Sequence, residues 1–359
     1  MEPRRAISVG QHGGQDRPAV SVIIPAYKIA GYIAETLASV FSQTFSDFEV
    51  IVLNDGSVDA DELCKAIEPY RARIKFINKV ANSGAGATRN LGAKCARGDV
   101  FVFLDGDDLW HPEFLARLLQ FKKDGGYGAV YSEAKTLVSE PYRVGDLFHL
   151  NPAGGEITRT HLINGECHIL PSGTLVDAEA FYRIGGFDPC VYRSEDFDLW
   201  MRLLFDGVRL GYLREALFTY RLRPNSLKGD MIQRIERCRD VWRGLQRKLP
   251  FTYEENAKVD LHIACEEAAI LRAEGRLAIY QKDWPTAREK FSEALRMANR
   301  LRLPFVHRMK MVGVLLALQL YPEIVRRQAI RLRDYEIDEN QIVVAKVEGD
   351  TFSPTFTVY

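Results

Sequence analysis

The chain has 359 residues, with 48 basic and 48 acidic side chains and a formal net charge of zero. Hydrophobic residues make up 47% and charged residues 27%, values that are typical of a folded globular protein and exclude a fibrous or largely disordered chain. Neutrality also argues against nucleic acid as the main partner, because dedicated nucleic-acid binders carry a basic excess. At roughly 150 residues per domain, the length predicts two or three domains.

The first part of the chain predicts a tail followed by alternating strands and helices. Residues 1–18 are rich in Gly, Gln and charged residues, and we expect a flexible tail without a signal segment. Strand–helix alternation predicts right-handed βαβ units and a mostly parallel sheet, in which ligands bind beyond the carboxyl ends of the strands. The expected strands are 20–25, 48–53, 75–78 and 99–104, and the expected helices are 32–43, 61–70 and 86–96.

The second part of the chain changes character twice. We expect residues 134–170 to be loops and residues 171–227 to be mixed, with an amphipathic helix over 197–205. From residue 229 helical periodicity dominates, so we place a domain boundary between a domain of residues 19–228 and a helical domain of residues 229–333. Residues 334–359 hold six acidic side chains and one basic one and form an acidic tail.

An apolar strand ends in Asp105-Gly106-Asp107-Asp108. Two carboxylates one residue apart on a turn are suited to share Mg²⁺ or Mn²⁺, and such a cation also binds phosphate oxygens. Aspartate-rich turns are also common without any ligand. The position directly after a buried strand favours the metal and diphosphate interpretation.

A glycine-rich segment, N-S-G-A-G-A-T-R-N-L-G at 82–92, precedes an expected helix. Glycines allow a ligand to approach the backbone closely, and the helix N-terminus attracts anions. Arg89, one turn into the helix, is placed to contact a diphosphate. The alternative is a simple turn with a surface arginine.

A third motif, S-E-D-F-D-L-W at 194–200, puts paired carboxylates just before an amphipathic helix. Such a pair suits general-base chemistry, in which one carboxylate takes a proton and its neighbour orients it. The alternative is a helix start in which Ser194 caps the helix and the acids complement its dipole.

Together these motifs resemble those of the family 2 glycosyltransferases, nucleotide-sugar enzymes with the GT-A fold. The resemblance runs from Val20 to about Ser226, a little under two thirds of the chain. The segments that carry it are V-S-V-I-I-P-A-Y at 20–27, V-L-N-D-G-S-V-D at 52–59, the glycine-rich segment at 82–92, L-D-G-D-D at 104–108, G-G-F-D at 185–188 and E-D-F-D-L-W-M-R at 195–202.

The resemblance implies an α/β GT-A domain with a nucleotide-sugar site, followed by an α-helical region. It implies that Pro25, Ala26 and Tyr27 line the base pocket and that Asp55 hydrogen-bonds the pyrimidine edge. Asn54 stands where the family usually has a first Asp.

The resemblance also implies the residues around the diphosphate and the reacting sugar. Gly84 and Arg89 approach the nucleotide and its diphosphate, and Asp105 with Gly106 lies near the ribose. The implied ligands of Mg²⁺ or Mn²⁺ are Asp105 and Asp107. The implied catalytic base is Asp196, with Glu195 beside it.

Five further residues are weaker candidates for acceptor or diphosphate contacts. Trp110 is a candidate to stack on an acceptor sugar, although aromatics at such positions are often core residues. Ser172 and Gly173 begin an expected strand beside the acceptor. Arg221 and Arg223 lie in a segment that resembles a loop closing over the diphosphate in some relatives.

The helical region holds two patterns. Gly275, Trp284, Ala287, Phe291 and Ala294 have the spacing of one tetratricopeptide helix pair. Because stacked repeats normally need about three copies, we favour a helical appendage packed on the catalytic domain. Residues 296–333 carry nine basic side chains and one acidic one around an apolar stretch at 311–321. This pattern is typical of a helix that lies on a membrane surface. The alternative is a buried helix with solvated basic ends.

The sequence therefore predicts an inverting, metal-dependent glycosyltransferase. We expect a nucleoside-diphosphate sugar as donor, with UDP favoured, and a hydroxyl of a saccharide or lipid-linked molecule as acceptor, in cell-surface polysaccharide or glycoconjugate synthesis. No apolar run reaches the length that spans a bilayer, so we expect a cytoplasmic protein with peripheral membrane contact. A nucleotidyl-transfer enzyme and a non-catalytic interaction protein are the alternatives.

Overall fold

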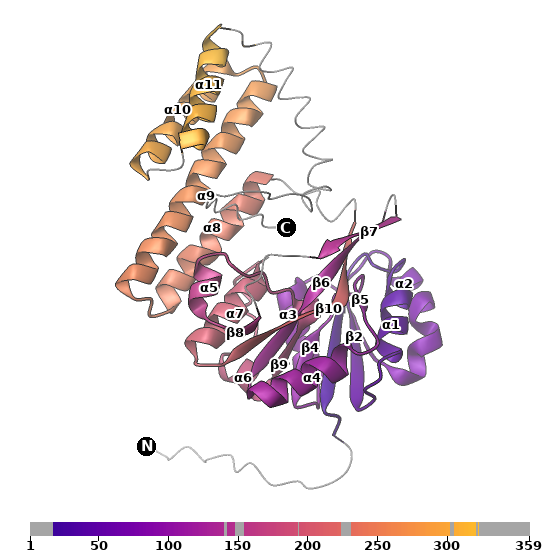
Figure 1. The fold of residues 1–359 in the computed structure, drawn as a ribbon. Helices are drawn as coiled ribbons and strands as arrows, with labels where there is room; N and C mark the ends of the chain where they lie inside the picture. The colour runs from indigo at the N-terminus through magenta and orange to yellow at the C-terminus, as the bar shows by residue number, and fades with distance from the viewer. Residues whose placement is uncertain are drawn as a thin grey trace, which may run out of the picture.

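The computed structural model of the chain describes residues 17–139, 142–147, 154–192, 194–223, 231–301, 305–320 and 322. A sheet with helices on both faces forms one end of the molecule, and an arm of four helices extends from it (Figure 1). The elements are β1 (Val20–Ala26), α1 (Ile33–Phe41), β2 (Phe48–Asp55), α2 (Ala60–Ile67), η1 (Glu68–Arg73), β3 (Lys75–Lys79), α3 (Ala85–Cys95), β4 (Val100–Phe103), β5 (Leu109–Trp110), α4 (Phe114–Gly125), β6 (Ala129–Ser139), β7 (Tyr142–Leu147), β8 (Gly155–Ile157), α5 (Arg159–Ile163), η2 (Pro171–Gly173), β9 (Thr174–Asp177), α6 (Ala178–Arg183), α7 (Glu195–Phe205), β10 (Leu210–Leu222), α8 (Met231–Lys248), α9 (Tyr253–Tyr280), α10 (Trp284–Arg300) and α11 (Phe305–Leu320).

The sheet is mixed rather than mostly parallel. Its order is β3-β2-β1-β4-β9-β6-β10-β5, with β7 added to β6 and β8 added to β10. The four strands β1 to β4 are parallel, as the alternation of strands and helices predicted. Beyond β4, strand β9 is antiparallel to both β4 and β6, while β6 and β10 are parallel to each other. The α/β fold with a helical C-terminal region is confirmed.

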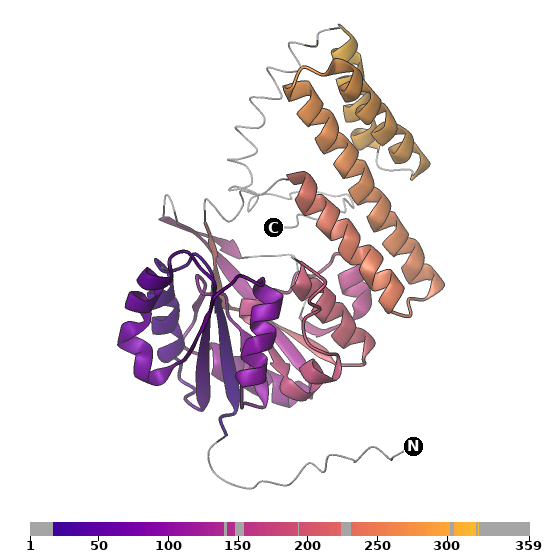
Figure 2. The same ribbon diagram turned by 180° about the vertical axis from the view of Figure 1, so that it is seen from behind.

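The parallel strands are buried on both faces, which explains their continuous apolar sequences. On β1, Val22 and Ile24 belong to a core made with α1, α2 and α4, while Ile23 belongs to the core on the other face with α3, α6 and α7. Figure 2 shows the sheet with its flanking helices from behind. Helix α3 lies so close to β1 that a Cβ on Gly92 would stand 2.3 Å from Ile23 Cγ2. A glycine is therefore required at this contact.

Residues 134–170 differ from the predicted loops. Strand β6 continues through residues 134–139, and β7, β8 and α5 follow within this range. The sequence does not indicate this strand, because several of its buried side chains are polar. Ser132, Glu133 and Thr136 are each less than 5% exposed, so the segment lacks the apolar run that marks a buried strand.

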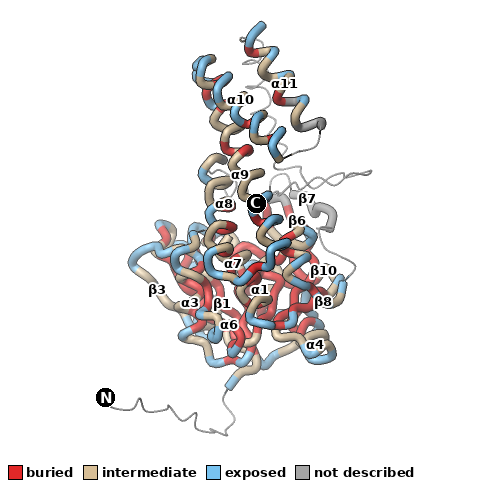
Figure 3. Tube along the Cα trace, turned by 90° about the vertical axis from the view of Figure 1, so that its left-hand side faces the viewer, coloured by how far each residue is buried: buried red, intermediate tan, exposed pale blue. Residues whose placement is uncertain are grey.

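The helical arm belongs to two different cores. Val241 and Trp242 of α8 and Val259 of α9 pack in the same core as α7 and the sheet. Farther along, α9, α10 and α11 form a separate small cluster that includes Phe291 and Met311, and Figure 3 shows few buried residues in that outer part. The change of core thus falls within α9, while the domain boundary near residue 228 stays a prediction.

The predicted basic segment lies only partly within the described residues. Its apolar stretch belongs to α11, where Met311 and Leu318 are buried against the neighbouring helices while Leu316 and Leu320 are exposed. Within the residues that the structure describes, no helix is long and apolar enough to cross a membrane. Residues 1–16, 302–304 and 323–359, with the predicted acidic tail, are outside the described ranges.

Candidate active site

The turn after β2 is built by an amide side chain. Asn54 Nδ2 donates to Asn78 Oδ1 at 2.7 Å, and Asn54 Oδ1 accepts the Ser57 N–H at 3.0 Å. The chain then turns at Gly56, which has φ +63°, and a Cβ there would stand 2.5 Å from the carbonyl carbon of Ala81. Asn54 therefore holds the turn that presents Asp55.

Asp55 faces the glycine-rich segment. Its Oδ1 accepts the Ser83 N–H at 2.9 Å and pairs with the ammonium of Lys79. Lys79 also donates to Thr88 Oγ1 at 2.7 Å. The carboxylate is 4% exposed. These contacts fix the end of β2 against the start of α3, and the role of Lys79 was not predicted.

The glycine-rich segment lies close to Tyr192 and Glu195, at the start of α7. Gly84 has φ +85° and immediately precedes α3. A Cβ on Gly84 would stand 3.3 Å from the Tyr192 ring, and one on Gly86 would stand 3.2 Å from Glu195 Cγ. The N-terminus of α3 therefore lies beside the loop that leads into α7.

Arg89 joins the two carboxylate motifs. Its Nη2 pairs with Asp105 Oδ1 at 2.6 Å and its Nη1 pairs with Glu195 Oε1 at 2.7 Å, while only 5% of its side chain is exposed. The guanidinium also lies over the ring of Phe187, 5.5 Å from its centroid. Because both Nη atoms are engaged, Arg89 holds the two carboxylates together. Its contact with a diphosphate stays a prediction.

The turn after β4 is held from three sides. The Asp105 N–H donates to Ser172 Oγ at 3.1 Å, and the Thr36 hydroxyl donates to the Gly106 carbonyl at 3.0 Å. Asp107 Oδ2 pairs with Arg223 Nε at 2.6 Å. Asp108 Oδ1 accepts the Arg221 N–H at 2.9 Å, which agrees with the expectation that Asp108 shapes this turn.

Burial and crowding of like charges disfavour ionised carboxylates on this turn. Burial is the main cause that raises the pKa of Asp107 to about 6, and Asp105 adds to it. Burial also raises the pKa of Asp108 well above its ordinary value, with Asp107 as the next cause. A cation bound here would relieve this repulsion.

Asp105 and Asp107 fit a divalent cation that is held jointly with a diphosphate. Carboxylate oxygens are the ligands that Mg²⁺ and Mn²⁺ prefer, and Mg²⁺ typically takes one or two of them plus substrate phosphates. Among the described residues, no group of three or more His, Cys, Asp or Glu side chains is placed to hold a metal. The protein therefore offers part of a coordination shell, and phosphate oxygens would have to complete it.

The acidic pair of 195–196 opens α7 without a serine cap. In the described part of the chain Ser194, at φ 55°, makes no side-chain hydrogen bond that caps α7, so the alternative in which Ser194 caps the helix does not hold. Asp196 Oδ1 accepts the Phe197 N–H at 2.8 Å. Burial, and then the charge of Glu195, raise the pKa of Asp196 to about 7, a value suited to a general base at neutral pH.

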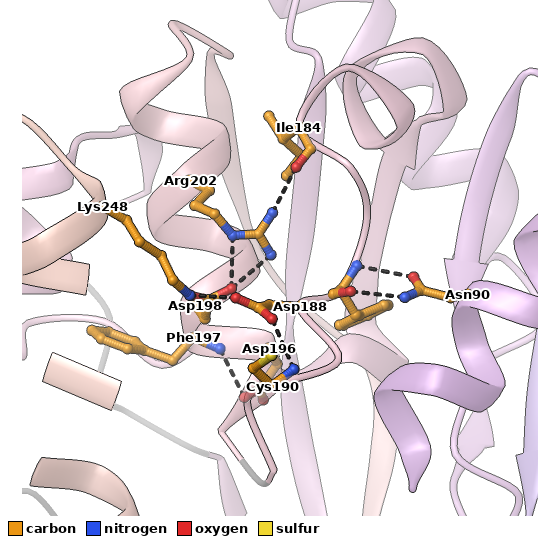
Figure 4. A network of polar contacts seen from close by, with 10 residues as sticks. Asn90, Ile184, Asp188, Cys190, Asp196, Phe197, Asp198, Arg202 and Lys248 are labelled. Atoms are coloured by element: carbon orange, nitrogen blue, oxygen red, sulfur yellow. Dashed lines mark hydrogen bonds and ion pairs between the residues drawn. The ribbon is translucent and has the colours of Figure 1, made fainter. Parts of the chain in front are cut away.

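A polar network fixes α7 behind this pair (Figure 4). The Asn90 side chain exchanges two hydrogen bonds with the Phe187 backbone, at 2.7 and 2.9 Å. Asp198, only 1% exposed, pairs with Arg202 Nη2 at 2.6 Å and with Lys248 Nζ at 3.4 Å. Lys248, from α8, also pairs with Asp188. The motifs G-G-F-D and E-D-F-D-L-W-M-R are thus linked to each other and to the helical arm.

The remaining predicted residues take different places. Ala26 is fully buried and Tyr27, the residue after it, is 40% exposed. Trp110 is 4% exposed, stacks on Phe114 at 4.4 Å and donates to the Ser172 carbonyl at 2.8 Å. This placement makes Trp110 a core residue and corrects the prediction that it stacks on an acceptor.

Ser172 and Gly173 also serve the turn after β4. They lie in η2, and the expected strand begins only at Thr174. Both are buried, and a Cβ on Gly173 would stand 2.3 Å from the Phe218 ring. Ser172 supports Asp105 through its hydroxyl, whereas Gly173 packs against the Phe218 ring.

The comparisons with known proteins agree with this arrangement. Residues 21–181 match the family model described as glycosyl transferase family 2. An uncharacterized glycosyltransferase of Rickettsia felis is 28% identical over 253 residues, which cover 68% of this chain and 40% of the relative. RP339 of Rickettsia prowazekii, also an uncharacterized glycosyltransferase, is 27% identical over 273 residues, with 74% and 83% covered. The matched part spans 35–40% of the length of the relatives from Rickettsia felis, Rickettsia bellii and Rickettsia conorii.

Two solved structures share the fold. S. aureus TarS 1-349 gives a TM-score of 0.58 at 19% identity and covers 92% of this chain and 93% of its own. The mannosyltransferase PcManGT from Pyrobaculum calidifontis, in complex with GDP-Man and Mn²⁺, gives 0.53 at 18% identity, with 92% and 89% covered. The family-model match over residues 21–181, the sequence relatives and the shared fold together support a family 2 glycosyltransferase.

Proposed function

We propose that the chain transfers a sugar from a nucleoside-diphosphate sugar, with UDP favoured, to a hydroxyl of a saccharide or lipid-linked acceptor, with inversion at the sugar. The observation that carries this proposal is the pairing of Arg89 with both Asp105 and Glu195. Through Arg89, the motif at 104–108, expected to hold the donor, lies next to the motif at 195–202, expected to activate the acceptor. TarS has been solved with UDP and with UDP-GlcNAc, which supports a nucleotide-sugar donor.

On the donor side, the chain's own residues bind and orient the nucleotide. Asp55 and the segment around Gly84 meet at the ends of β2 and α3, where the base and the backbone of the nucleotide would lie. Pro25, Ala26 and Tyr27 end the neighbouring strand β1. Asp105 and Asp107 would hold Mg²⁺ or Mn²⁺, which when bound neutralises charge on the leaving diphosphate.

On the acceptor side, Asp196 takes the proton of the attacking hydroxyl. The hydroxyl oxygen forms a bond to the anomeric carbon from the face opposite the diphosphate, and the bond from that carbon to the diphosphate oxygen breaks. The proton remains on Asp196 and the nucleoside diphosphate leaves with its electron pair. A hydroxyl is a weak nucleophile at neutral pH, so the base must lie within hydrogen-bond reach of it.

The substitution Asp196→Asn tests the assignment of the base. The amide cannot take a proton, so we expect sugar transfer to fall by about 10²–10⁴-fold while UDP affinity in the presence of Mn²⁺ stays within about twofold. Asp124→Asn, at an exposed position of α4, is the matched control. Near-normal transfer by Asp196→Asn would refute the role of Asp196.

Calorimetry with UDP, with and without Mn²⁺, separates this proposal from a non-catalytic interaction protein, for which we expect no metal-dependent nucleotide affinity. A panel of nucleotide sugars then separates it from nucleotidyl transfer. Release of nucleoside diphosphate supports glycosyl transfer, whereas release of pyrophosphate from a nucleoside triphosphate would support the alternative.

We further propose that the outer helices meet a membrane surface, where a lipid-linked acceptor in polysaccharide or glycoconjugate synthesis would be found. Leu316 and Leu320 of α11 are 54% and 64% exposed and lie one turn apart. Arg288, Leu316 and Gln319 line one shallow depression between α10 and α11. Binding to anionic liposomes should fall strongly when residues 296–333 are removed, and unchanged binding would refute the membrane contact.

A further inference from the structure

Two arginines at the end of β10 reach the same turn. Arg221 and Arg223 are two residues apart, and residues with this spacing on an extended chain point to the same side. Both contact Asp107, one through its backbone carbonyl and the other through its carboxylate. Their environments differ in a way that bears on metal binding.

Arg221 is locked in place. Its Nε donates to the Asp107 carbonyl at 2.8 Å, its Nη2 pairs with Glu35 at 2.7 Å, and its backbone N–H donates to Asp108. Only 4% of the side chain is exposed. These contacts leave the carboxylate of Asp107 untouched, so Arg221 shapes the turn without competing for a ligand oxygen.

Arg223 instead occupies the carboxylate that a cation would need. Its Nε lies 2.6 Å from Asp107 Oδ2, and its Nη1 donates to the Lys28 carbonyl at 3.1 Å. The side chain is 24% exposed, against 12% for Asp107. Arg223 therefore lies at the mouth of the turn, where it has room to exchange its partner.

We propose that Arg223 is an internal counter-cation of Asp107, which a divalent cation arriving with the nucleotide displaces, and that the freed guanidinium then pairs with the diphosphate. The inference rests on the proposed function. A nucleoside diphosphate with one divalent cation keeps a net negative charge, so the displaced guanidinium finds a new anionic partner. Guanidinium groups pair with phosphate oxygens as well as they pair with carboxylate oxygens.

This exchange couples metal binding to nucleotide binding. A metal ion that binds alone must displace Arg223 from Asp107, and the displaced guanidinium then has no new anionic partner. A metal ion that binds with the nucleotide brings the diphosphate as a replacement partner. The wild-type protein should bind Mn²⁺ weakly alone and much more tightly with UDP. Without the guanidinium at residue 223, the two affinities should move toward each other.

The test is a comparison of Arg223→Met with the wild type, by electron paramagnetic resonance of Mn²⁺ alone and by calorimetry of UDP in Mn²⁺. We expect the variant to bind Mn²⁺ alone roughly five- to tenfold more tightly, and UDP in Mn²⁺ weaker by a similar factor. Arg209→Met is the matched control, because Arg209 pairs with the exposed Glu156 just before β10. It should change neither affinity.

Arg223→Lys provides a second variant that keeps the charge and loses the paired N–H groups. It should shift Mn²⁺ affinity in the same direction by a smaller factor. Equal or weaker Mn²⁺ binding by both variants would overturn the inference. If the wild type fails to bind UDP even with Mn²⁺, the proposed function itself fails, whereas normal UDP binding with unchanged Mn²⁺ affinity in the variants rejects only the exchange.

Discussion

The helical arm has an inner half, made of α8 and the first part of α9, and an outer half, made of the rest of α9 with α10 and α11. The two halves differ in what they pack against. In the inner half, Trp242 of α8 packs edge-on against Phe197 at 4.9 Å and stacks on His262 of α9 at 4.9 Å. Phe197 directly follows Asp196, the candidate base. In the outer half, Phe291 of α10 packs against Gly275 of α9, and the cluster contains no residue of the sheet domain among those described.

Polar contacts repeat the same contrast. The inner half pairs with the sheet domain through Lys248, and also through Glu255, which pairs with Arg159 at 2.6 Å, and His262, whose Nε2 lies 2.6 Å from the Ile163 carbonyl. In the outer half, the ion pair between Lys290 and Glu274 stays within the arm. The inner half therefore supports α7, the helix that carries the candidate base, and the outer half extends from the inner half.

The largest expected difference between the halves comes from removing one buried ring in each. Trp242→Ala should lower stability by about 3–5 kcal/mol and reduce sugar transfer, since Phe197 loses its packing partner beside Asp196. Phe291→Ala removes a ring that is equally buried. We expect the lost stability to appear as local unfolding of the outer helices, without an effect on the sheet domain. Thermal unfolding and the rate of sugar transfer of both variants measure this.

A loss of sugar transfer in Phe291→Ala as large as that in Trp242→Ala would contradict the division of the arm. It would mean that the outer cluster also supports the site. A variant that shortens the chain after residue 301 gives the same comparison without a core cavity, and we expect it to bind UDP as the full chain does.

A smaller effect is expected from the ion pairs between α7 and α8. Asp198→Asn keeps the volume of the side chain but leaves Arg202 and Lys248 without their buried carboxylate. Removing one partner of a buried pair typically costs a few kcal/mol, and we expect about 3 kcal/mol because Lys248 keeps Asp188. Glu215→Gln, which breaks the exposed pair with Arg117, should cost less than about 1 kcal/mol. Equal urea midpoints for the two variants would contradict the support role of this joint.

Much of the sheet domain was predictable because its buried strands have a clear sequence pattern. Strands buried on both faces need continuous apolar sequence, and β1, β2 and β4 have it. The site motifs follow such strands or open helices, so their positions in the fold were predictable too. The exception is β6, where burial of Glu133 and Thr136 removes the apolar signal that would have marked the strand.

The partners within the site were not predictable, because tertiary contacts select them. Arg89 and Glu195 are 106 residues apart, and only the fold brings the guanidinium to both acidic motifs. Lys248 looks like a surface residue at the end of a helix, and nothing in the sequence indicates that it joins Asp188 and Asp198. Arg223 was expected near a diphosphate, whereas its ion pair with Asp107 depends on where β10 ends.

The smallest expected effect concerns a carboxyl group between the two halves. Burial raises the pKa of Glu266 on α9 to about 7, although the positive charges of Arg272 and Arg234 act to lower it. Its other titratable neighbours are the thiols of Cys238 and Cys265, whose pKa values are also raised by burial. In the unfolded chain the carboxyl ionises near its ordinary pKa of 4.5, so the folded protein holds the proton more tightly than the unfolded one.

The contribution of Glu266 to folding stability should therefore fall as pH rises from about 4.5 to about 7, because the unfolded chain loses this proton first. Glu266→Gln removes the titration, so the variant should gain about 1–2 kcal/mol relative to the wild type at pH 8 and nothing at pH 4.5. Urea unfolding at both pH values measures the difference. Glu289→Gln, at an exposed position of α10, should show no such pH dependence. A Glu266→Gln variant that gains as much at pH 4.5 as at pH 8 would show that the effect is packing and not ionisation.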